Sequence, residues 1–121
     1  MEILDKFRNW KDIEEHPAGT IIFSEGEPAE VLYVIISGKV ELNLHGERLE
    51  LVGEGELIGE IALSPPDTRY ATAKSLTSVK LARMDRDQLN HFMGENTEFP
   101  LHVMTVLANR LRAITRRLGS V

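Results

Sequence analysis

One stretch of the sequence, from Gly55 to Ala73, brings together residue types that could hold an anion. Gly59 and Glu60 precede an apolar triplet, a loop with two prolines follows, and a single arginine, Arg69, comes next. A glycine lets the backbone approach a ligand closely, and the N–H groups of a short helical turn can face negative charge. Arg69 adds a planar fork of donors that suits a phosphate group. The stretch therefore predicts a phosphate site inside the fold.

Glu60 indicates that this phosphate belongs to a sugar. Its carboxylate cannot serve the phosphate, so we expect it to accept a hydrogen bond from a sugar hydroxyl. A carboxylate and an arginine around one turn suit a ribose phosphate better than bare phosphate. The alternative is an empty pocket of the same fold, in which Arg69 pairs with Glu60 as a structural ion pair.

Short strands with glycine turns are predicted from about residue 13 to residue 84, because apolar residues there alternate with polar ones. In the clearest case the alternation runs over 40–44, reverses at a hairpin turn over 45–46, and resumes at Leu49 and Leu51. These strands have to position the anion-binding stretch.

Helices are predicted on either side of the strands. Apolar residues on one face of the first ten residues predict a short N-terminal helix. A helix over about 85–94 begins at Asp85, with Gln88 three residues later in the position of a capping box. The final helix is predicted over about 97–118. Strands followed by helices indicate an α+β fold with an antiparallel core, in a single domain of 121 residues.

Composition excludes several classes of function. The net charge of −5 argues against broad electrostatic binding to nucleic acid or to anionic lipid. No cysteine, no signal peptide and no apolar run of membrane-spanning length occur, so we expect a cytoplasmic protein without a membrane partner. The four histidines share no metal-ligand spacing and no serine–histidine–aspartate ordering stands out, which predicts no metal site, no catalytic residues and no enzyme.

The anion-binding stretch resembles the phosphate-binding cassette of cyclic-nucleotide-binding domains, the family of the bacterial catabolite activator protein and of kinase regulatory subunits. The family pattern is Gly-Glu, a small apolar triplet, a variable loop, then Arg, a small residue and Ala. Here "GEIAL" is followed by the loop "SPPDT" and by "RYAT". Upstream, "FSEGEPAEVLYVIISGKVEL" matches the glycine–acid turn, the Tyr strand and the Ser-Gly turn of the family. We interpret Gly26 and Glu27 in this block as a structural turn that closes the roll.

The resemblance implies an antiparallel β-roll (a double-stranded β-helix, jelly-roll-like) with a short helix in the cassette. It implies as ligand a purine 3′,5′-cyclic monophosphate, with no further cofactor. Arg69 would pair with the cyclic phosphate and Glu60 with the ribose 2′-hydroxyl, and backbone N–H groups would complete the cradle. The site would comprise Gly59, Glu60, Ile61, Ala62, Arg69, Tyr70 and Ala71.

Tyr70 departs from the family pattern, which usually has Ser, Thr or Ala after the arginine. A Ser or Thr at this position is often linked to guanine in the family, so its absence favours cyclic AMP over cyclic GMP. The bulky ring puts the affinity in question but not the fold.

The last helix carries a stripe of apolar residues at intervals of 3, 4, 3 and 4, which is the a/d seam of a coiled coil. The seam consists of Met104, Leu107, Leu111, Ile114 and Leu118. It predicts a homodimer through this helix, and the alternative is that the stripe packs on the chain's own roll. In the catabolite activator family the equivalent helix forms the dimer and caps the nucleotide base, which implies base contacts from Ile114 and Thr115. We interpret the four arginines of this helix, Arg110, Arg112, Arg116 and Arg117, as a solvated face with favourable charge at the helix C-terminus.

The predicted function is a regulatory domain that binds a cyclic nucleotide and signals through movement of the C-terminal helix. No helix-turn-helix segment follows, so we expect no direct contact with nucleic acid from this chain. Two alternatives stay open. One is a ligand-free member that acts only as a dimerisation module, and the other is the sensor piece of a longer transcriptional regulator or effector.

Overall fold

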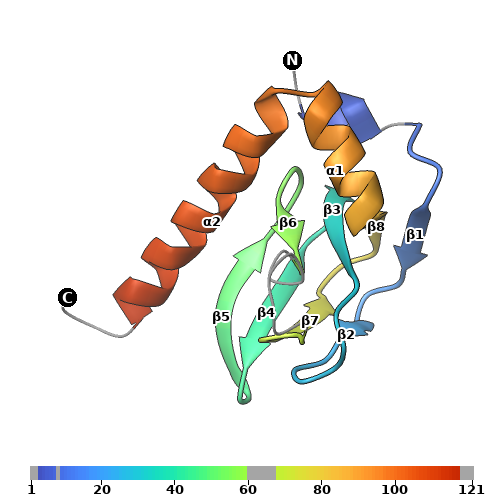
Figure 1. Cartoon of the computed structure of the whole chain (residues 1–121). Helices are drawn as coiled ribbons and strands as arrows, with labels where there is room; N and C mark the ends of the chain where they lie inside the picture. Colours follow the sequence, from blue (N-terminus) through green and yellow to red (C-terminus); the bar gives the residue numbers. More distant parts are fainter. Residues whose placement is uncertain (1–2, 8, 60–67, 118–121) are drawn as a thin grey trace.

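The computed structural model describes residues 3–7, 9–59 and 68–117. Within these ranges the chain forms a two-sheet roll with helices packed on one side (Figure 1). The strands are β1 (Ile13–His16), β2 (Ile21–Phe23), β3 (Val31–Ser37), β4 (Val40–Leu44), β5 (Glu47–Val52), β6 (Leu57–Ile58), β7 (Thr72–Ser75) and β8 (Val79–Asp85). The helices are the 3-10 helix η1 (Ile3–Phe7) and the α-helices α1 (Arg86–Glu95) and α2 (Glu98–Arg117).

The two sheets are antiparallel throughout. One has the strand order β1-β8-β3-β6 and the other the order β2-β7-β4-β5. One apolar cluster lies between the two sheets, and a second lies between the first sheet and the helices. The α+β β-roll predicted from the sequence is confirmed.

β3 is buried on both faces, and this position explains its continuous apolar sequence. Leu32 and Val34 face the helices, whereas Tyr33 and Ile35 face the interior of the roll. Because successive side chains of a strand point to opposite faces, β3 contributes to both clusters.

The helical side is held by an aromatic cluster of Phe7, Trp10, Phe92 and Phe99. Their ring centroids lie 4.8 to 6.1 Å apart in five pairs. Phe7 is fully buried and anchors the short N-terminal helix, which is a 3-10 helix. The indole Nε1 of Trp10 donates to the carbonyl oxygen of Arg83 at 2.8 Å, so this segment is also fixed to the sheet.

The helix boundaries that lie within the described ranges differ by one residue from the predicted ones. The Asp85 side chain accepts from the backbone N–H of Gln88, and the Gln88 side chain accepts from the backbone N–H of Asp85, both at 2.8 Å, so the capping box is confirmed. α1 continues one residue past the predicted end, and α2 is described as far as Arg117. No helix within the described ranges is long and apolar enough to cross a membrane.

The hairpin between β4 and β5 is confirmed, but the inward face of β5 is not the one predicted. Leu42 lies opposite Glu50 while the next residue of β4 lies opposite Arg48, so Leu49 is an extra residue on β5. This bulge shifts the alternation by one position. Leu51 is therefore 46% exposed, and Val52 is buried in the roll instead.

Candidate phosphate-binding site

The backbone of Arg69 is pinned to the turn between β2 and β3. Its N–H donates to the carbonyl oxygen of Glu27 at 2.9 Å, and its carbonyl oxygen accepts from the N–H of Gly26 at 2.8 Å. The Glu27 carboxylate in turn accepts from the N–H of Ser24 at 2.6 Å. Gly26 and Glu27 thus form the structural turn predicted from the sequence, and this turn also fixes the position of Arg69.

The side chain of Arg69 is buried, with 7% of its surface exposed. Its Nη1 donates to the carbonyl oxygen of Gly59 at 3.3 Å. Its Cζ lies over the ring of Phe23, 4.2 Å from the ring centroid, which is a cation–π distance. The guanidinium is therefore held at two points that come from different parts of the chain.

Gly59 has to be a glycine in this arrangement for two reasons. Its φ of +80° lies in the left-handed region, which other residues adopt only with strain. In addition, a Cβ at this position would lie far inside van der Waals contact of Arg69 Nη1. Arg69 thus approaches the backbone of Gly59 closely, and the approach of a ligand that the sequence predicts there stays a prediction.

The ring beneath Arg69 rests on a second ring. Phe23 and Tyr33 are stacked with 6.4 Å between centroids and 13° between planes. Burial raises the pKa of the Tyr33 hydroxyl, the negative charge of Glu14 raises it further, and Arg69 and Arg83 lower it. The hydroxyl consequently stays protonated beside the Glu14 carboxylate.

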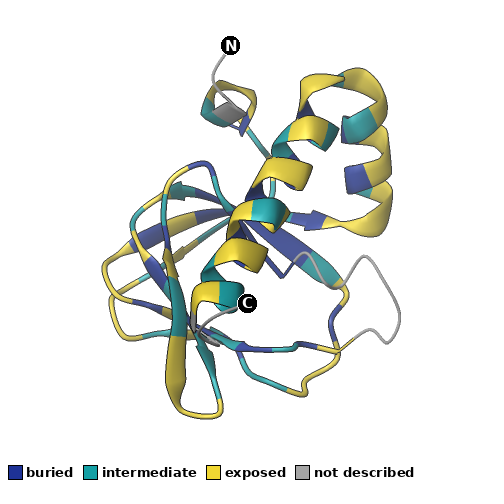
Figure 2. Cartoon of the chain, turned by 90° about the vertical axis from the view of Figure 1, so that its left-hand side faces the viewer, coloured by how far each residue is buried: buried dark blue, intermediate teal, exposed yellow. Residues whose placement is uncertain are grey.

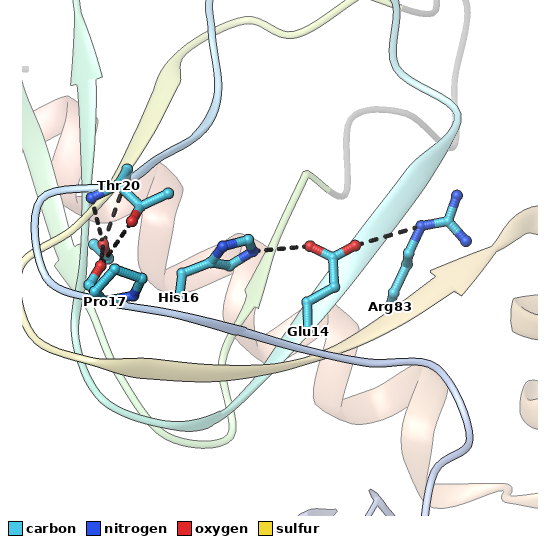
Figure 3. A network of polar contacts seen from close by, with 6 residues as sticks. Glu14, His16, Pro17, Thr20 and Arg83 are labelled. Carbon is cyan, nitrogen blue, oxygen red and sulfur yellow. Dashed lines mark hydrogen bonds and ion pairs between the residues drawn. The ribbon is translucent and has the colours of Figure 1, made fainter.

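Glu14 supplies the negative charge that raises the pKa of the Tyr33 hydroxyl. Figure 3 shows its carboxylate between His16 and Arg83. Oε1 lies 3.0 Å from His16 Nε2, and Oε2 lies 3.7 Å from Arg83 Nε. The same view shows the turn before β2, where the carbonyl oxygen of Pro17 accepts from Thr20 Oγ1 at 2.8 Å.

Arg110 corrects one interpretation of the sequence, because it is buried rather than part of a solvated face. It is 5% exposed, its Nε donates to Glu50 Oε2 at 2.9 Å, and its Nη2 donates to the carbonyl oxygen of Leu57 at 2.8 Å. Arg112 and Arg116 are exposed, as predicted. The signal for Arg110 was available in the sequence, since it stands four and seven residues after Val106 and Val103 on one helical face.

Arg69 and Arg110 contact carbonyl oxygens only two residues apart, at Gly59 and Leu57. His102 of α2 donates from Nε2 to the carbonyl oxygen of Gly55, which precedes the same segment. α2 is therefore tied directly to the strand that leads into the predicted cassette.

The predicted seam lies on the side of α2 that the roll leaves uncovered, as the exposed colouring along this helix illustrates (Figure 2). Met104, Leu107 and Leu111 are 57%, 36% and 65% exposed. The alternative that this stripe packs on the chain's own roll is thus wrong for these three residues. Ile114 and Thr115, the predicted base contacts, are half-buried.

The other predicted site residues are described only in part. Ala71 is buried and Tyr70 is half-buried. Glu60, Ile61, Ala62 and the cassette helix lie outside the described residues, as does Leu118 of the seam. Within the described ranges, no group of three or more His, Asp or Glu residues could hold a metal ion.

A comparison with protein-family models decides the class of this fold. The cyclic nucleotide-binding domain model matches residues 13–96, which include the roll, Gly59, Arg69 and α1. The chain belongs to the cyclic nucleotide-binding domain family. The resemblance of the sequence to this family is therefore confirmed.

Three known proteins illustrate what this chain is similar to. A CRP-like cAMP-activated global transcriptional regulator of Mycobacterium tuberculosis is 33% identical over 112 residues, which cover 88% of this chain and 50% of the relative. The c-di-GMP responsive global regulator CLP of Xanthomonas campestris is similar in structure, with a TM-score of 0.81, 26% identity, and coverage of 96% and 61%. The catabolite activator protein of Thermus thermophilus has a TM-score of 0.76, 28% identity, and coverage of 95% and 56%. The chain spans about half the length of this curated relative from Mycobacterium tuberculosis.

Proposed function

We propose that this chain is a non-enzymatic regulatory domain that binds a purine 3′,5′-cyclic monophosphate, with cyclic AMP preferred over cyclic GMP. The observation that carries the proposal is the buried guanidinium of Arg69, held against Gly59 in a chain of the cyclic nucleotide-binding family. A planar fork of donors at this position suits the two free oxygens of a cyclic phosphate.

The proposed contacts follow the cassette residue by residue. Arg69 pairs with the cyclic phosphate, and Glu60 accepts from the ribose 2′-hydroxyl. The N–H groups of Ile61, Ala62 and Ala71 complete the cradle around the phosphate. Ile114 and Thr115 of α2 contact the base. The preference for cyclic AMP rests on Tyr70, which stands where Ser or Thr is often linked to guanine in the family.

The proposed output is a movement of α2. Arg110 and His102 tie this helix to the segment that ends at Gly59, so a ligand that displaces Gly59 also acts on the hydrogen bonds of α2. A ligand can shift α2 only if it binds one arrangement of this segment better than the other. The contacts of α2 with Gly55 and Leu57 supply a direct mechanical route for that shift.

Two further parts of the proposal concern assembly. The exposed residues Met104, Leu107 and Leu111 have coiled-coil spacing, and we expect them to form a homodimer through α2. The relative from Mycobacterium tuberculosis is about twice as long and is a transcriptional regulator. This supports a role as the sensor domain of a longer cytoplasmic regulator, in which another segment would contact DNA.

The first test is a calorimetric titration of protein from which any co-purified nucleotide has been removed. Cyclic AMP should bind with a dissociation constant in the micromolar range or lower, and more tightly than cyclic GMP. Cyclic di-GMP is included because a structural relative responds to it. No heat and no thermal shift with any of the three would contradict nucleotide binding and favour a dimerisation module with an empty pocket.

Arg69 is tested by replacement with Ala and with Lys. Arg69→Ala should weaken the binding of cyclic AMP by about 3–5 kcal/mol, because the buried phosphate charge loses its partner. Arg69→Lys should also bind poorly, because an ammonium group does not reproduce the fork. Arg48→Ala is the matched control, since Arg48 is an exposed arginine paired with Glu41. Affinity close to that of the unaltered protein in either Arg69 variant would contradict the proposed contact.

A further inference from the structure

Phe23 lies in a position that the proposed nucleotide contacts do not use. Its ring is 6% exposed, and the guanidinium carbon of Arg69 lies 4.2 Å from its centroid. A cation that lies this close to an aromatic face, in a site largely removed from water, is stabilised there. The stabilisation is worth roughly a factor of ten or more in the equilibrium constant for the contact. The ring therefore contributes to where the guanidinium rests.

Two described contacts constrain the orientation of this guanidinium. The ring of Phe23 fixes the position of Cζ, and the carbonyl oxygen of Gly59 fixes the direction of Nη1. A planar group that is held at its centre and at one edge keeps little freedom to tilt. Because the five N–H donors of a guanidinium lie in its plane, the same two contacts fix the direction in which they point.

The ring of Phe23 is itself supported by a neighbouring ring, that of Tyr33. Tyr33 stacks on it, and the negative charge near the Tyr33 hydroxyl is that of Glu14, which also contacts His16 and Arg83. Both rings belong to the apolar cluster between the two sheets. The support for Arg69 thus includes a second ring behind the first.

A bulge in β2 aims the ring of Phe23 at Arg69. The register between β2 and β7 shifts between Ile21 and Phe23. Ile22 and Phe23 are neighbours in sequence, yet both pack against the apolar cluster inside the roll. In a regular strand two consecutive side chains would point to opposite faces, so the bulge is what turns Phe23 inward.

From these contacts we infer that Phe23 is a positioning residue, an aromatic platform that fixes the plane of the Arg69 guanidinium for contact with the cyclic phosphate. The functional consequence rests on the proposed nucleotide site, whereas the contact between ring and guanidinium does not. Phe23 touches no nucleotide in this scheme and acts only through Arg69. Its effect on affinity should accordingly disappear once Arg69 is removed.

The contact is tested by NMR in the nucleotide-free protein. Protons of a guanidinium that lies over an aromatic face are shifted upfield by the ring current. The side-chain N–H protons of Arg69 should show this shift, retain it in Phe23→Tyr and Phe23→Trp, and lose it in Phe23→Leu. Arg48 supplies the reference, because its Nε lies 2.7 Å from Glu41 Oε2 in an exposed ion pair. Absence of the upfield shift in the unaltered protein would overturn the inference, whatever the outcome of nucleotide titrations.

The consequence is tested by titration with cyclic AMP. Phe23→Leu should bind about tenfold more weakly, and the two aromatic variants should stay within about threefold of the unaltered protein. In an Arg69→Ala background, Phe23→Leu should cause no further loss, which is the coupling expected of a double-mutant cycle. Val40→Ala, which removes methyl groups from the same cluster, controls for a general loss of stability. A tenfold loss in Val40→Ala as well, or an undiminished loss in the Arg69→Ala background, would overturn the positioning role.

Discussion

Two arginines within the described ranges are buried, Arg69 and Arg110, and they contact the same short segment but differ in their described contacts. Arg110 pairs with the carboxylate of Glu50 and donates to the carbonyl oxygen of Leu57. The described contacts of Arg69 are the carbonyl oxygen of Gly59 and the face of an aromatic ring. Both side chains are less than a tenth exposed, so burial by itself does not distinguish them.

The difference lies in what each set of contacts does. The carboxylate of Glu50 balances the charge of Arg110. Together with the carbonyl oxygen of Leu57 it joins α2 to β5 and β6, so the role of Arg110 is structural. A ring face and one carbonyl oxygen around Arg69 fix the orientation of a planar group. Among the described contacts, the type of contact, more than the degree of burial, distinguishes Arg110, which joins two elements, from Arg69, which we propose to contact a ligand.

The largest effect on stability is expected at Arg110. Arg110→Met should lower the free energy of unfolding by about 3 kcal/mol, because Glu50 keeps its charge in a poorly exposed position and loses its partner. Urea denaturation followed by circular dichroism measures this change. Arg112→Met, at an exposed position of the same helix, should change stability by less than about 0.5 kcal/mol.

A second replacement shows whether the stranded charge is the cause. Arg110→Met combined with Glu50→Leu should recover most of the loss, because no unpaired charge is left at the junction. If Arg110→Met lowered the free energy of unfolding as little as Arg112→Met, the contacts of Arg110 would not stabilise the packing of α2 on the roll. The contrast between the two buried arginines would then fail.

The two arginines also differ in how far the sequence reveals them. Arg69 stands in a local pattern within ten residues of Gly59, so its role could be predicted without knowledge of the fold. Arg110 was grouped with the other arginines of α2, although the spacing from Val103 and Val106 places it on the buried face. The overall roll, the hairpin and the capping box also depend on local patterns, and these predictions are confirmed.

What the sequence could not reveal depends on register between distant strands. The bulge at Leu49 reverses the predicted face of Leu51, and it is visible only once β4 and β5 are paired. The platform role of Phe23 depends on a bulge between β2 and β7, which lie about fifty residues apart in sequence. An extra residue in a strand leaves no mark on composition or spacing, because its effect appears only against a partner strand.

The exposed seam lies on a different face of α2 from Arg110, and it should affect assembly without affecting the roll. Leu111→Glu should weaken the proposed dimer by about 2 kcal/mol, or roughly 30-fold in its dissociation constant, because a charge replaces an apolar contact. Sedimentation equilibrium measures this constant. Asn109→Glu adds the same charge at an exposed polar position off the seam and should leave the dimer unchanged. Equal behaviour of the two variants would exclude the seam as the dimer contact.

The smallest expected effect is that of replacing Gly59 by Ala. Comparison with the same change at Gly46 separates the cost of backbone strain from the effect on the position of Arg69. Gly59 and Gly46 both have positive φ, +80° and +85°, so Ala at either position should cost about 1–2 kcal/mol of stability. A Cβ at Gly46 meets no atom within 4 Å, whereas a Cβ at Gly59 meets Arg69 Nη1. Gly59→Ala should therefore bind cyclic AMP about tenfold more weakly, a loss of about 1.4 kcal/mol, while Gly46→Ala retains its affinity.

Thermal unfolding and calorimetric titration of both variants give the two quantities separately. Equal losses of stability combined with a loss of affinity only in Gly59→Ala would mean that the close approach of Arg69 to the backbone serves ligand binding. Equal affinities in the two variants would mean that Arg69 tolerates displacement by this Cβ. The glycine would then be required for the turn alone, and the orientation of Arg69 would depend chiefly on the ring of Phe23.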